Sequence, residues 1–505
     1  MTITATGTGA YRSAKPNQFV SSRAQFDDLQ RQLATKKKSE TFAGLGMDRG
    51  RSLDLNNRLS TLEGYLTGIQ RADVNLKLAT QAVENFAKMT RETVSDTRAG
   101  SYQPSSTGRT APQVLAEEKF KQALDLLNTN VNGRYLFSGR TANELPVVDY
   151  SLIMNGDGAG KAGLKQLISE RREADLGVDG FGRLTTGGSG TAATIAKEPG
   201  NPPYGFDLIG ASTSSAALTV NYTAGPPADV AVDVVGTPLP GETLTIRLKL
   251  PDDTVEEITL TARAEGTDGT AHGSFAIGPD NATTAMRLRE TIDAALSREA
   301  NTTLSAASAQ VAAENFFAGS PNNPPLRVPG PPFDAAATAP APGTDANTVI
   351  WYRGDDATGS ARATSSVQVD QSQLVATGAR ANEQAFRIGL AQFAVLAAET
   401  FQASDPNSEA RYEALTGRSR NALGYPPGTQ NPSEIIVELG TAQTALAQAK
   451  ERHTATKNYL TTTLDGIENV TTEEVAVQIL ALQNQLKASY QTTSIPPQLS
   501  LTNYL

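Results

Sequence analysis

The chain contains no cysteine, and among its 505 residues histidine occurs only at His272 and His453. Thiol nucleophiles and thiolate metal sites are therefore excluded, and most histidine-based chemistry lacks the residues it needs. We expect no catalytic residue, no metal site and no cofactor, and hence no enzymatic activity.

Large side chains and long apolar runs are also scarce. Aromatic residues make up 6% of the chain, whereas glycine and proline number 43 and 27, which favours a thin, elongated architecture over a thick globular interior. No apolar stretch reaches the ~18 residues of a membrane span. Residues 1–22 lack the basic start and apolar run of a cleavable signal peptide, so we expect any export to use another route.

Positive charge is not in excess. The formal net charge is -9, the pI is near 5.1, and the one basic run is Lys36–Lys37–Lys38. Because nucleic-acid partners require clustered Lys and Arg, we expect none. Three lysines are more typical of a helix end, where the C-terminal dipole favours cations.

Apolar residues recur with helical spacing near both ends of the chain. Residues 1–22 lack this pattern, which predicts a disordered tail, and Ser22 is the predicted N-cap of a short helix after it. A break at residues 100–108 separates two further N-terminal helices, the second ending at Asn132–Gly133. Spacings of four and three place the following residues on heptad seams: Leu55, Leu59, Leu62, Leu66 and Ile69 near the N-terminus, and Ile435, Leu439, Leu446, Leu460, Val475, Ile479, Leu482 and Leu486 near the C-terminus.

The middle of the chain alternates with period two. Residues 243–250 and 255–260 flank a Pro-Asp-Asp-Thr turn and predict a β-hairpin. Further strands are expected at 218–222 and 230–235, covered by a helix with Leu288, Ile292 and Leu296 on one face. Residues 321–342 are dense in proline and alanine and predict a linker, and residues 349–352 and 367–369 predict a last hairpin.

These patterns predict a mainly α fold with an inserted α+β region. Long antiparallel, coiled-coil-like terminal helices would form a bundle core, with β-rich outer domains projecting from the middle. The predicted segments are a disordered tail at 1–22, an N-terminal helical core at 23–145, a connecting segment at 146–200, a β-rich outer domain at 201–345, a β-hairpin at 346–372 and a C-terminal helical core at 373–505.

Several motifs invite a chemical interpretation and favour a structural one. The loop at 155–161 is rich in glycine and contains Lys161, but Asn155 stands where a phosphate loop begins with glycine and Ala162 where it has a hydroxyl. We interpret it as a turn. His453 lies on a helix seam and is expected to be packed, and His272 is expected in a loop. The acidic pairs Asp252–Asp253 and Asp355–Asp356 are expected to be solvated turn residues.

The C-terminal end is nearly free of charge. From Val475 to Leu505 the only charged side chain is Lys487. A nearly uncharged amphipathic helix suits a close-packed oligomer, in which a buried unpaired charge would be costly. We therefore predict self-association through the seam residues named above.

The segment from Asn132 to Gly139, with Gly133, Arg134, Tyr135 and Phe137 inside it, resembles the end of the N-terminal helical hairpin in the flagellin superfamily, most closely in hook-filament junction proteins. Residues 33–37, Leu-Ala-Thr-Lys-Lys, are similar to a Leu-Ser-Thr-Gly-Lys stretch of that family, with Ala34 in place of serine and Lys36 in place of glycine. Residues 486–490 and 499–501 also look like the junction proteins. The resemblance spans residues 20–150 and 346–505.

This resemblance implies an extracellular structural component of the bacterial flagellum, a hook-associated protein joining hook to filament. Its partners would be other copies of itself, neighbouring hook-associated proteins and flagellin, with a cytoplasmic export chaperone on the C-terminal helix. Type III export would need no cleavable signal peptide. A flagellin filament subunit is the alternative, and a surface adhesin carried by residues 200–345 is a more remote one.

Overall fold

The computed structural model describes residues 9–266 and 273–494, so His272 and residues 499–501 lie outside the described part. Helices predominate and several small sheets accompany them, so the fold is mixed α with some β. Contacts between residues divide the chain into two compact units. The first takes in the described residues of Met1–Ala72, Val367–Val375 and Thr444–Leu505, and the second combines Asp73–Ser366 with Ala376–Gln443.

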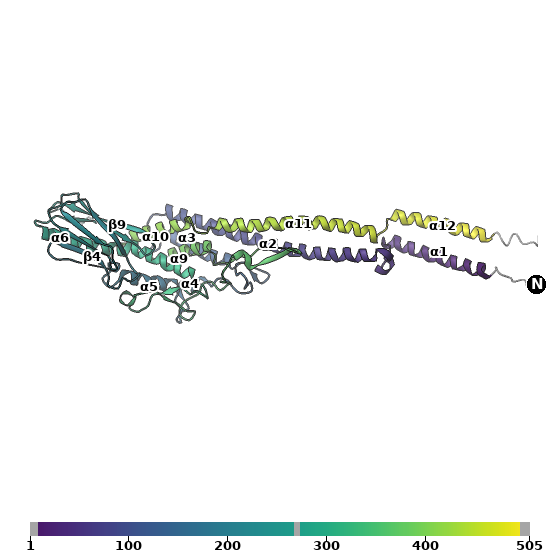
Figure 1. Ribbon diagram of the computed structural model, residues 1–505, viewed down its shortest axis with the longest axis horizontal. Coiled ribbons are helices and arrows are strands. Elements are labelled where there is room, and N and C mark those ends of the chain that lie inside the picture. The colour runs from purple at the N-terminus through teal and green to yellow at the C-terminus, as the bar shows by residue number, and fades with distance from the viewer. Residues whose placement is uncertain (1–8, 267–272, 495–505) are drawn as a thin grey trace, which may run out of the picture. The chain divides into compact units, whose positions relative to one another are not determined.

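The first unit is built from helices of both chain ends. In Figure 1, α1 lies beside α12 and α2 lies beside α11. The elements that supply this unit are α1 (Gly9–Thr35), a 3-10 turn (Phe42–Asp48), the beginning of α2 (Arg49–Ala99), the end of α11 (Pro432–Glu468), α12 (Thr472–Ser494) and a hairpin of β13 (Ser366–Asp370) and β14 (Gln373–Ala376).

The first helix begins earlier than the sequence pattern predicts. Because α1 starts at Gly9, Ser22 is not an N-cap, and the predicted disordered tail is wrong for residues 9–22; residues 1–8 lie outside the described part. α1 packs along α12. Tertiary contacts of this kind stabilise helices whose own sequence gives only a weak signal.

The second unit contains two four-stranded sheets. One has the order β3-β4-β7-β6 and is antiparallel; the other has the order β10-β9-β8-β5, with β10 parallel to β9 and the other pairs antiparallel. The strands are β3 (Leu184–Gly187), β4 (Ala192–Lys197), β5 (Asp207–Thr213), β6 (Leu218–Thr223), β7 (Asp229–Val234), β8 (Thr243–Lys249), β9 (Val255–Arg263) and β10 (Ser274–Ala276).

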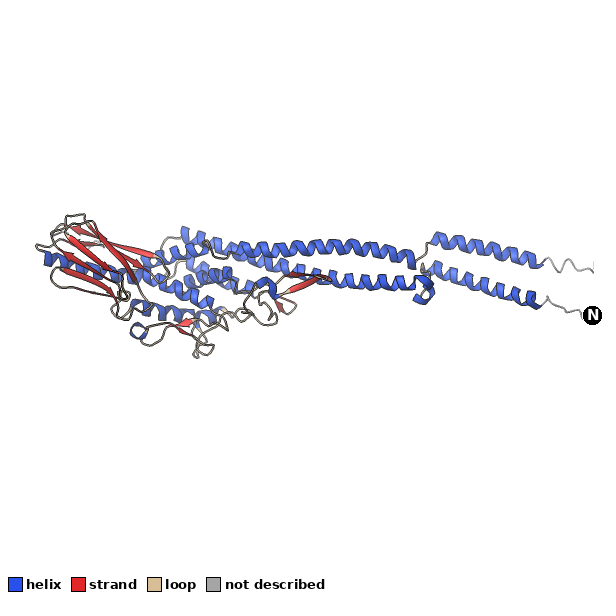
Figure 2. Ribbon diagram, viewed as in Figure 1, coloured by secondary structure: helices blue, strands red, loops and turns tan. Residues whose placement is uncertain are grey.

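The predicted hairpin and its covering helix are confirmed. β8 and β9 pair around the 251–254 turn, and Leu244, Ile246 and Leu248 are completely buried. Helix α6 (Asn281–Glu299) packs against strands of both sheets, so both sheets contribute to one hydrophobic core around it. Figure 2 shows the strands gathered next to this helix. A π-helical turn (Ala300–Leu304) continues α6 into α7 (Ser305–Ala318).

A helical layer forms the rest of the second unit. Its core is aromatic: Phe317 packs edge-on against both Phe120 and Trp351, and Phe86 against Phe386. The indole N–H of Trp351 donates to the carbonyl oxygen of Phe317 at 3.0 Å. The remaining helices are α3 (Ala111–Leu127), α4 (Tyr150–Asn155), α5 (Leu164–Leu176), α8 (Phe333–Ala336), α9 (Gln384–Ala398) and α10 (Ser408–Leu423), with a 3-10 turn at Ala361–Thr364.

Two predictions for the middle of the chain are corrected. The connecting segment 146–200 contains α4 and α5 and the strands β3 and β4, so the sheet begins before residue 201. Residues 321–342 are not a free linker, because β11 (Leu326–Arg327) pairs with β12 (Ala341–Pro342), and Val328 and Ala337 are buried. The proline-rich segment is therefore fixed in place, because its Val328 and Ala337 pack in one cluster with Tyr204.

The predicted hairpin between 349–352 and 367–369 is also wrong. β13 pairs with its sequence neighbour β14, whereas Tyr352 forms a single bridge to Val147. Both segments do pair with other extended segments, but not with each other.

Candidate functional site

The two chain ends meet along an antiparallel pair of helices, α2 and α11, in the first unit. The Ser52 hydroxyl donates to Glu468 Oε1 at 2.5 Å, and further along the pair Lys457 Nζ lies 2.9 Å from Glu63 Oε1. An apolar cluster fills the space between these polar contacts. Its buried members are Leu55, Leu460 and Ile467, with Leu59, Leu62 and Leu464 partly buried around them.

The thirteen seam residues predicted as an assembly interface are all at least partly buried within a single chain. Eight of them are buried, namely Leu55, Ile69, Ile435, Leu439, Leu446, Leu460, Val475 and Leu482. The other five, Leu59, Leu62, Leu66, Ile479 and Leu486, are half-buried. The structure thus shows contacts of these residues within one chain, and their role in an assembly interface stays a prediction. Helical spacing identifies a packed face but not the chain on which it packs.

The surface of the first unit carries exposed apolar side chains on the opposite faces of the same helices. On α12, Val477 is 65% exposed and Leu480 is 59% exposed. Tyr459 on α11 and Met47 in the 3-10 turn are also exposed. No acidic or basic residue other than Lys487 follows Glu474 in α12. Helix α12 therefore has a buried apolar face toward α1 and a partly apolar face toward solvent, where Glu473, Glu474 and Lys487 are its charged residues.

A short joint ties the end of α1 to the end of α11. The amide of Val470 donates to the carbonyl oxygen of Lys36 at 3.0 Å, and the amide of Lys38 donates to that of Glu468 at 2.7 Å. Lys38 Nζ donates to the carbonyl oxygen of Gly466 at 2.9 Å, so a lysine of the basic run does cap a helix end, as the sequence indicates. That end belongs to α11, however, not to the helix that precedes the lysines.

Lys36 adopts a left-handed conformation within this joint, with φ of 58°. Its amide donates to the carbonyl oxygen of Gln32 at 2.7 Å, which closes the C-terminus of α1. Glycine is the residue that ordinarily occupies this position of a helix end. Lys36 is the position at which the family resemblance has glycine. The sequence analysis did not single out Lys36 as a functional or structural position. The glycine of the family stretch was nevertheless a signal that the backbone there is left-handed.

The motif at 132–139 has an exposed half and a buried half. Asn132 and Gly133 both have positive φ, 52° and 80°, and join β1 (Asn130–Val131) to β2 (Arg134–Tyr135) in a two-residue hairpin. Such a turn favours Asn-Gly. The predicted helix end at these residues is corrected, because α3 already ends at Leu127.

The buried half of this motif connects to the start of α9. The Phe137 ring packs edge-on against Phe386 at a centroid separation of 5.7 Å, and the Ala381 amide donates to the Phe137 carbonyl oxygen at 2.8 Å. Gly139 has φ of 67°, and a Cβ there would lie 2.7 Å from Cβ of Asp355. The motif therefore holds the N-terminal segment against the C-terminal helices of the second unit.

His453 is a packed residue. It is 4% exposed, its ring stacks on Tyr65 at a centroid separation of 5.6 Å, and Nε2 lies 2.5 Å from the carbonyl oxygen of Val369. These contacts link α11 to α2 and to β13 within the first unit. The histidine is enclosed by structural partners.

The glycine-rich loop at 155–161 is closed on itself. Asp157 Oδ1 accepts hydrogen bonds from the amides of Ala159 and Lys161, both at 2.8 Å. These backbone hydrogen bonds hold the pKa of the Asp157 carboxyl below its usual value. A carboxylate already occupies the amides that a phosphate would need, which supports the interpretation as a turn.

The two acidic pairs differ from the expected solvated turns. Asp253 is exposed, but Asp252 is largely buried and pairs with Arg418 of α10, its carboxylate 2.7 Å from Nε. Asp355 is also largely buried and accepts a hydrogen bond from the Ala357 amide at 3.1 Å. These carboxylates are structural partners of residues that the local sequence does not reveal.

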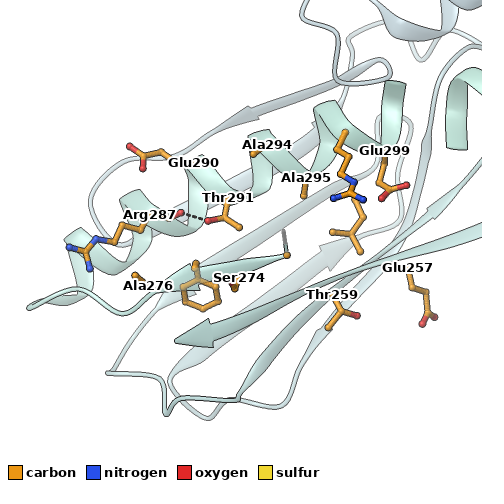
Figure 3. A pocket seen from close by; sticks show the side chains of 14 residues that line it. Glu257, Thr259, Ser274, Ala276, Arg287, Glu290, Thr291, Ala294, Ala295 and Glu299 are labelled. Atoms are coloured by element: carbon orange, nitrogen blue, oxygen red, sulfur yellow. Dashed lines mark hydrogen bonds between the residues drawn. The ribbon is translucent and has the colours of Figure 1, made fainter. Parts of the chain in front are cut away.

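One groove in the second unit has a volume of about 610 Å³ and lies between α6 and strands β9 and β10 (Figure 3). Its charged lining residues are Glu257, Arg287, Glu290, Arg298 and Glu299. Across residues 9–266 and 273–494, no group of three His, Asp or Glu side chains could hold a metal ion.

None of the helices in the described part of the chain is both long and apolar enough to cross a membrane. Comparison with known proteins identifies no relative: no family model, curated protein or solved structure matches this chain.

Proposed function

We propose that this chain is a structural component of the bacterial flagellum that joins the hook to the filament, with its N- and C-terminal helices packing against those of neighbouring copies. The observation that carries the proposal is the first unit. Helices from both chain ends form it, and α12 buries one face against α1 while its outer face exposes Val477 and Leu480 in a stretch free of charge between Glu474 and Lys487. Exposed apolar side chains next to one another on a helix favour contact with another protein surface over exposure to water.

The resemblance to the flagellin superfamily gives independent support at two positions. Lys36 is left-handed where the family has glycine, and Asn132–Gly133 form a tight turn within the family motif. At both positions the backbone has positive φ, a conformation that glycine and asparagine favour.

We further propose that α2 and α11 act as a coiled-coil-like pair in the assembled state, with the β-rich part of the second unit facing outward. The partners would be other copies of this chain, neighbouring hook-associated proteins and flagellin, and a cytoplasmic chaperone that holds the C-terminal helix before type III export. In this proposal the protein is located outside the cell and its role is structural, not enzymatic.

Immunogold labelling of intact flagella with an antibody against residues 200–345 tests the proposal. Label confined to the boundary between hook and filament is the expected result. Label along the whole filament would identify a filament subunit, which uses the same helices in many more copies. Label absent from flagella would overturn the flagellar role and favour an adhesin carried by the β-rich part.

A further inference from the structure

Three arginines converge on a polar cavity of about 450 Å³ in the second unit, which lies beside the 3-10 turn at Ala361–Thr364 and the start of α9. Two of them have partners in the protein, although Nε and Nη1 of Arg362 and Nε of Arg380 are buried without a hydrogen bond to any described residue. Arg362 donates to Glu383 and lies 3.1 Å from Glu438 Oε2. Arg380 donates to two backbone carbonyl oxygens, of Ala357 and Gly359, both at 2.6 Å.

The third, Arg387, has no such partner. It lies on α9 one turn after Glu383 and is half-buried, and its Nε is shielded from solvent without a hydrogen bond to any residue in the described part of the chain. Burial lowers the pKa of the Arg387 guanidinium below its usual value, and no neighbouring carboxylate offsets that burial. A half-buried guanidinium without an ion pair is stabilised when a carboxylate binds it.

The carboxylates around Arg387 are committed elsewhere. Glu383 and Glu438 contact Arg362, Asp356 accepts hydrogen bonds from Asn322, and Glu314 accepts one from Gln310. These carboxylates outnumber the three arginines, so the lining has no excess of positive charge, but none of them forms an ion pair with Arg387.

A second cavity, of about 280 Å³, adjoins the first through Arg387 and Gln384, which line both. Ile388, Ala422 and Pro426 contribute an apolar wall to this second cavity. The guanidinium thus lies where a polar cavity meets an apolar one.

We propose that Arg387 binds a carboxylate carried on a short apolar group. The guanidinium fork matches the two oxygens of a carboxylate, and the apolar group would cover Ile388, Ala422 and Pro426. The carboxylate belongs either to a free small organic acid or to an acidic side chain next to an apolar one in another polypeptide. This inference rests on the geometry of Arg387 and is independent of the flagellar role.

Ligand-observed NMR titration of the full chain at constant ionic strength provides the test. The probes are 3-methylbutanoate, its neutral amide, and the peptide acetyl-Leu-Glu-Leu-amide. We expect at least one acidic probe to bind, the neutral amide not to bind, and Arg387→Gln to weaken binding by about tenfold or more. The matched control is Arg263→Gln, an exposed arginine at the end of β9, which should leave binding unchanged.

The two acidic probes distinguish the sources. Tighter binding of 3-methylbutanoate indicates a free acid, and tighter binding of the peptide indicates a polypeptide partner. Equal binding of the amide and the acids, or binding that survives Arg387→Gln, would overturn the proposal. Should Arg387→Gln fail to fold, Arg387→Lys decides: it keeps the charge but loses the fork, and affinity equal to that of the unaltered chain would contradict a bidentate site.

Discussion

Lys36 occupies a backbone conformation that disfavours its own side chain. Its φ of 58° places it in the left-handed region at the end of α1, where a residue with a Cβ costs roughly 1–2 kcal/mol relative to glycine. We predict that Lys36→Gly raises the free energy of unfolding by about 1 kcal/mol, part of the relief being offset by the greater freedom of glycine in the unfolded chain. Urea denaturation monitored by circular dichroism measures this change in the free energy of unfolding.

Lys37→Gly is the matched control for that change. Lys37 forms a β-bridge with Asn469 and does not share the positive φ, so glycine there should lower stability slightly or leave it unchanged. A stabilising Lys37→Gly, or a destabilising Lys36→Gly, would contradict the assignment of a strained helix end.

Two glycines of the 132–139 motif offer a second comparison. Both have positive φ, but a Cβ at Gly139 would collide with Asp355, whereas no atom lies within 4 Å of a Cβ at Gly133. We predict that Gly133→Ala costs about 1 kcal/mol for the backbone alone, and that Gly139→Ala costs on the order of 3 kcal/mol because overpacking adds to it. If denaturant unfolding shows the same loss of stability in both variants, the close approach of Asp355 to Gly139 does not contribute to the effect of Gly139→Ala.

For single residues, the sequence allowed a prediction from the residue type and its neighbours, but it did not show which residues far away in the chain would be in contact with them. Asp252 and Asp253 look alike as a turn, yet only Asp252 is buried, because Arg418 lies beside it in space and 166 residues away in sequence. Asp355 is a similar case. Neighbouring residues cannot disclose a partner on another element, so a solvated turn was the natural but incorrect expectation for both.

Among the elements, regular apolar periodicity was the dependable signal. The alternation of β8 and the spacing of Leu288, Ile292 and Leu296 in α6 predicted both the elements and their buried faces. Helix α7 was missed because it is rich in alanine and buried on almost every side. A helix enclosed by other helices has no polar face, and therefore no amphipathic period to detect.

Helix α12 allows the two faces of one element to be separated. Leu482 is 7% exposed, whereas Leu480, two residues before it, is 59% exposed. We predict that Leu482→Ala destabilises the packing of α12 by about 2–4 kcal/mol through lost burial and a cavity, while Leu480→Ala changes it by less than about 0.5 kcal/mol. Hydrogen exchange of the α12 amides in the isolated chain resolves the two variants. Similar protection in both would show that α12 does not pack through Leu482.

For the whole molecule, the sequence indicated that the two ends belong together, and the structure brings them together in one unit. It did not indicate which side chains would face another copy, because a heptad seam has the same spacing whether it packs within a chain or between chains. The predicted seam is largely buried in the single chain, and the exposed residues of α12 fall between its positions.

The proposed role predicts that carboxylates introduced on the outer face of α12 prevent assembly without unfolding the subunit. We predict that the double variant Val477→Glu, Leu480→Glu keeps the helical circular dichroism of the original chain but loses incorporation into flagella, because carboxylates buried at a contact cost several kcal/mol each. Swimming in soft agar and the sedimentation of detached flagella measure the loss.

The matched control for this double variant is Gln478→Glu, Gln485→Glu, which adds the same charge at two exposed polar positions of the same helix. It should be incorporated more readily. Equal loss in both double variants would point to the net charge of the helix, and full incorporation of the first would exclude Val477 and Leu480 from the contact.

The hydrogen bond between Ser52 and Glu468 joins residues that lie 416 positions apart in the chain. The first unit therefore cannot be completed by a nascent chain from which α11 and α12 are still missing, since these helices follow all the other described elements. By contrast, the second unit is made of residues between Asp73 and Gln443 and contains the two sheets with their shared core. A chain that emerges from its N-terminus thus keeps α1 and the start of α2 without their partners until α11 and α12 have appeared. The pairing of these helices then closes a very long loop, whose entropic cost grows only slowly with loop length.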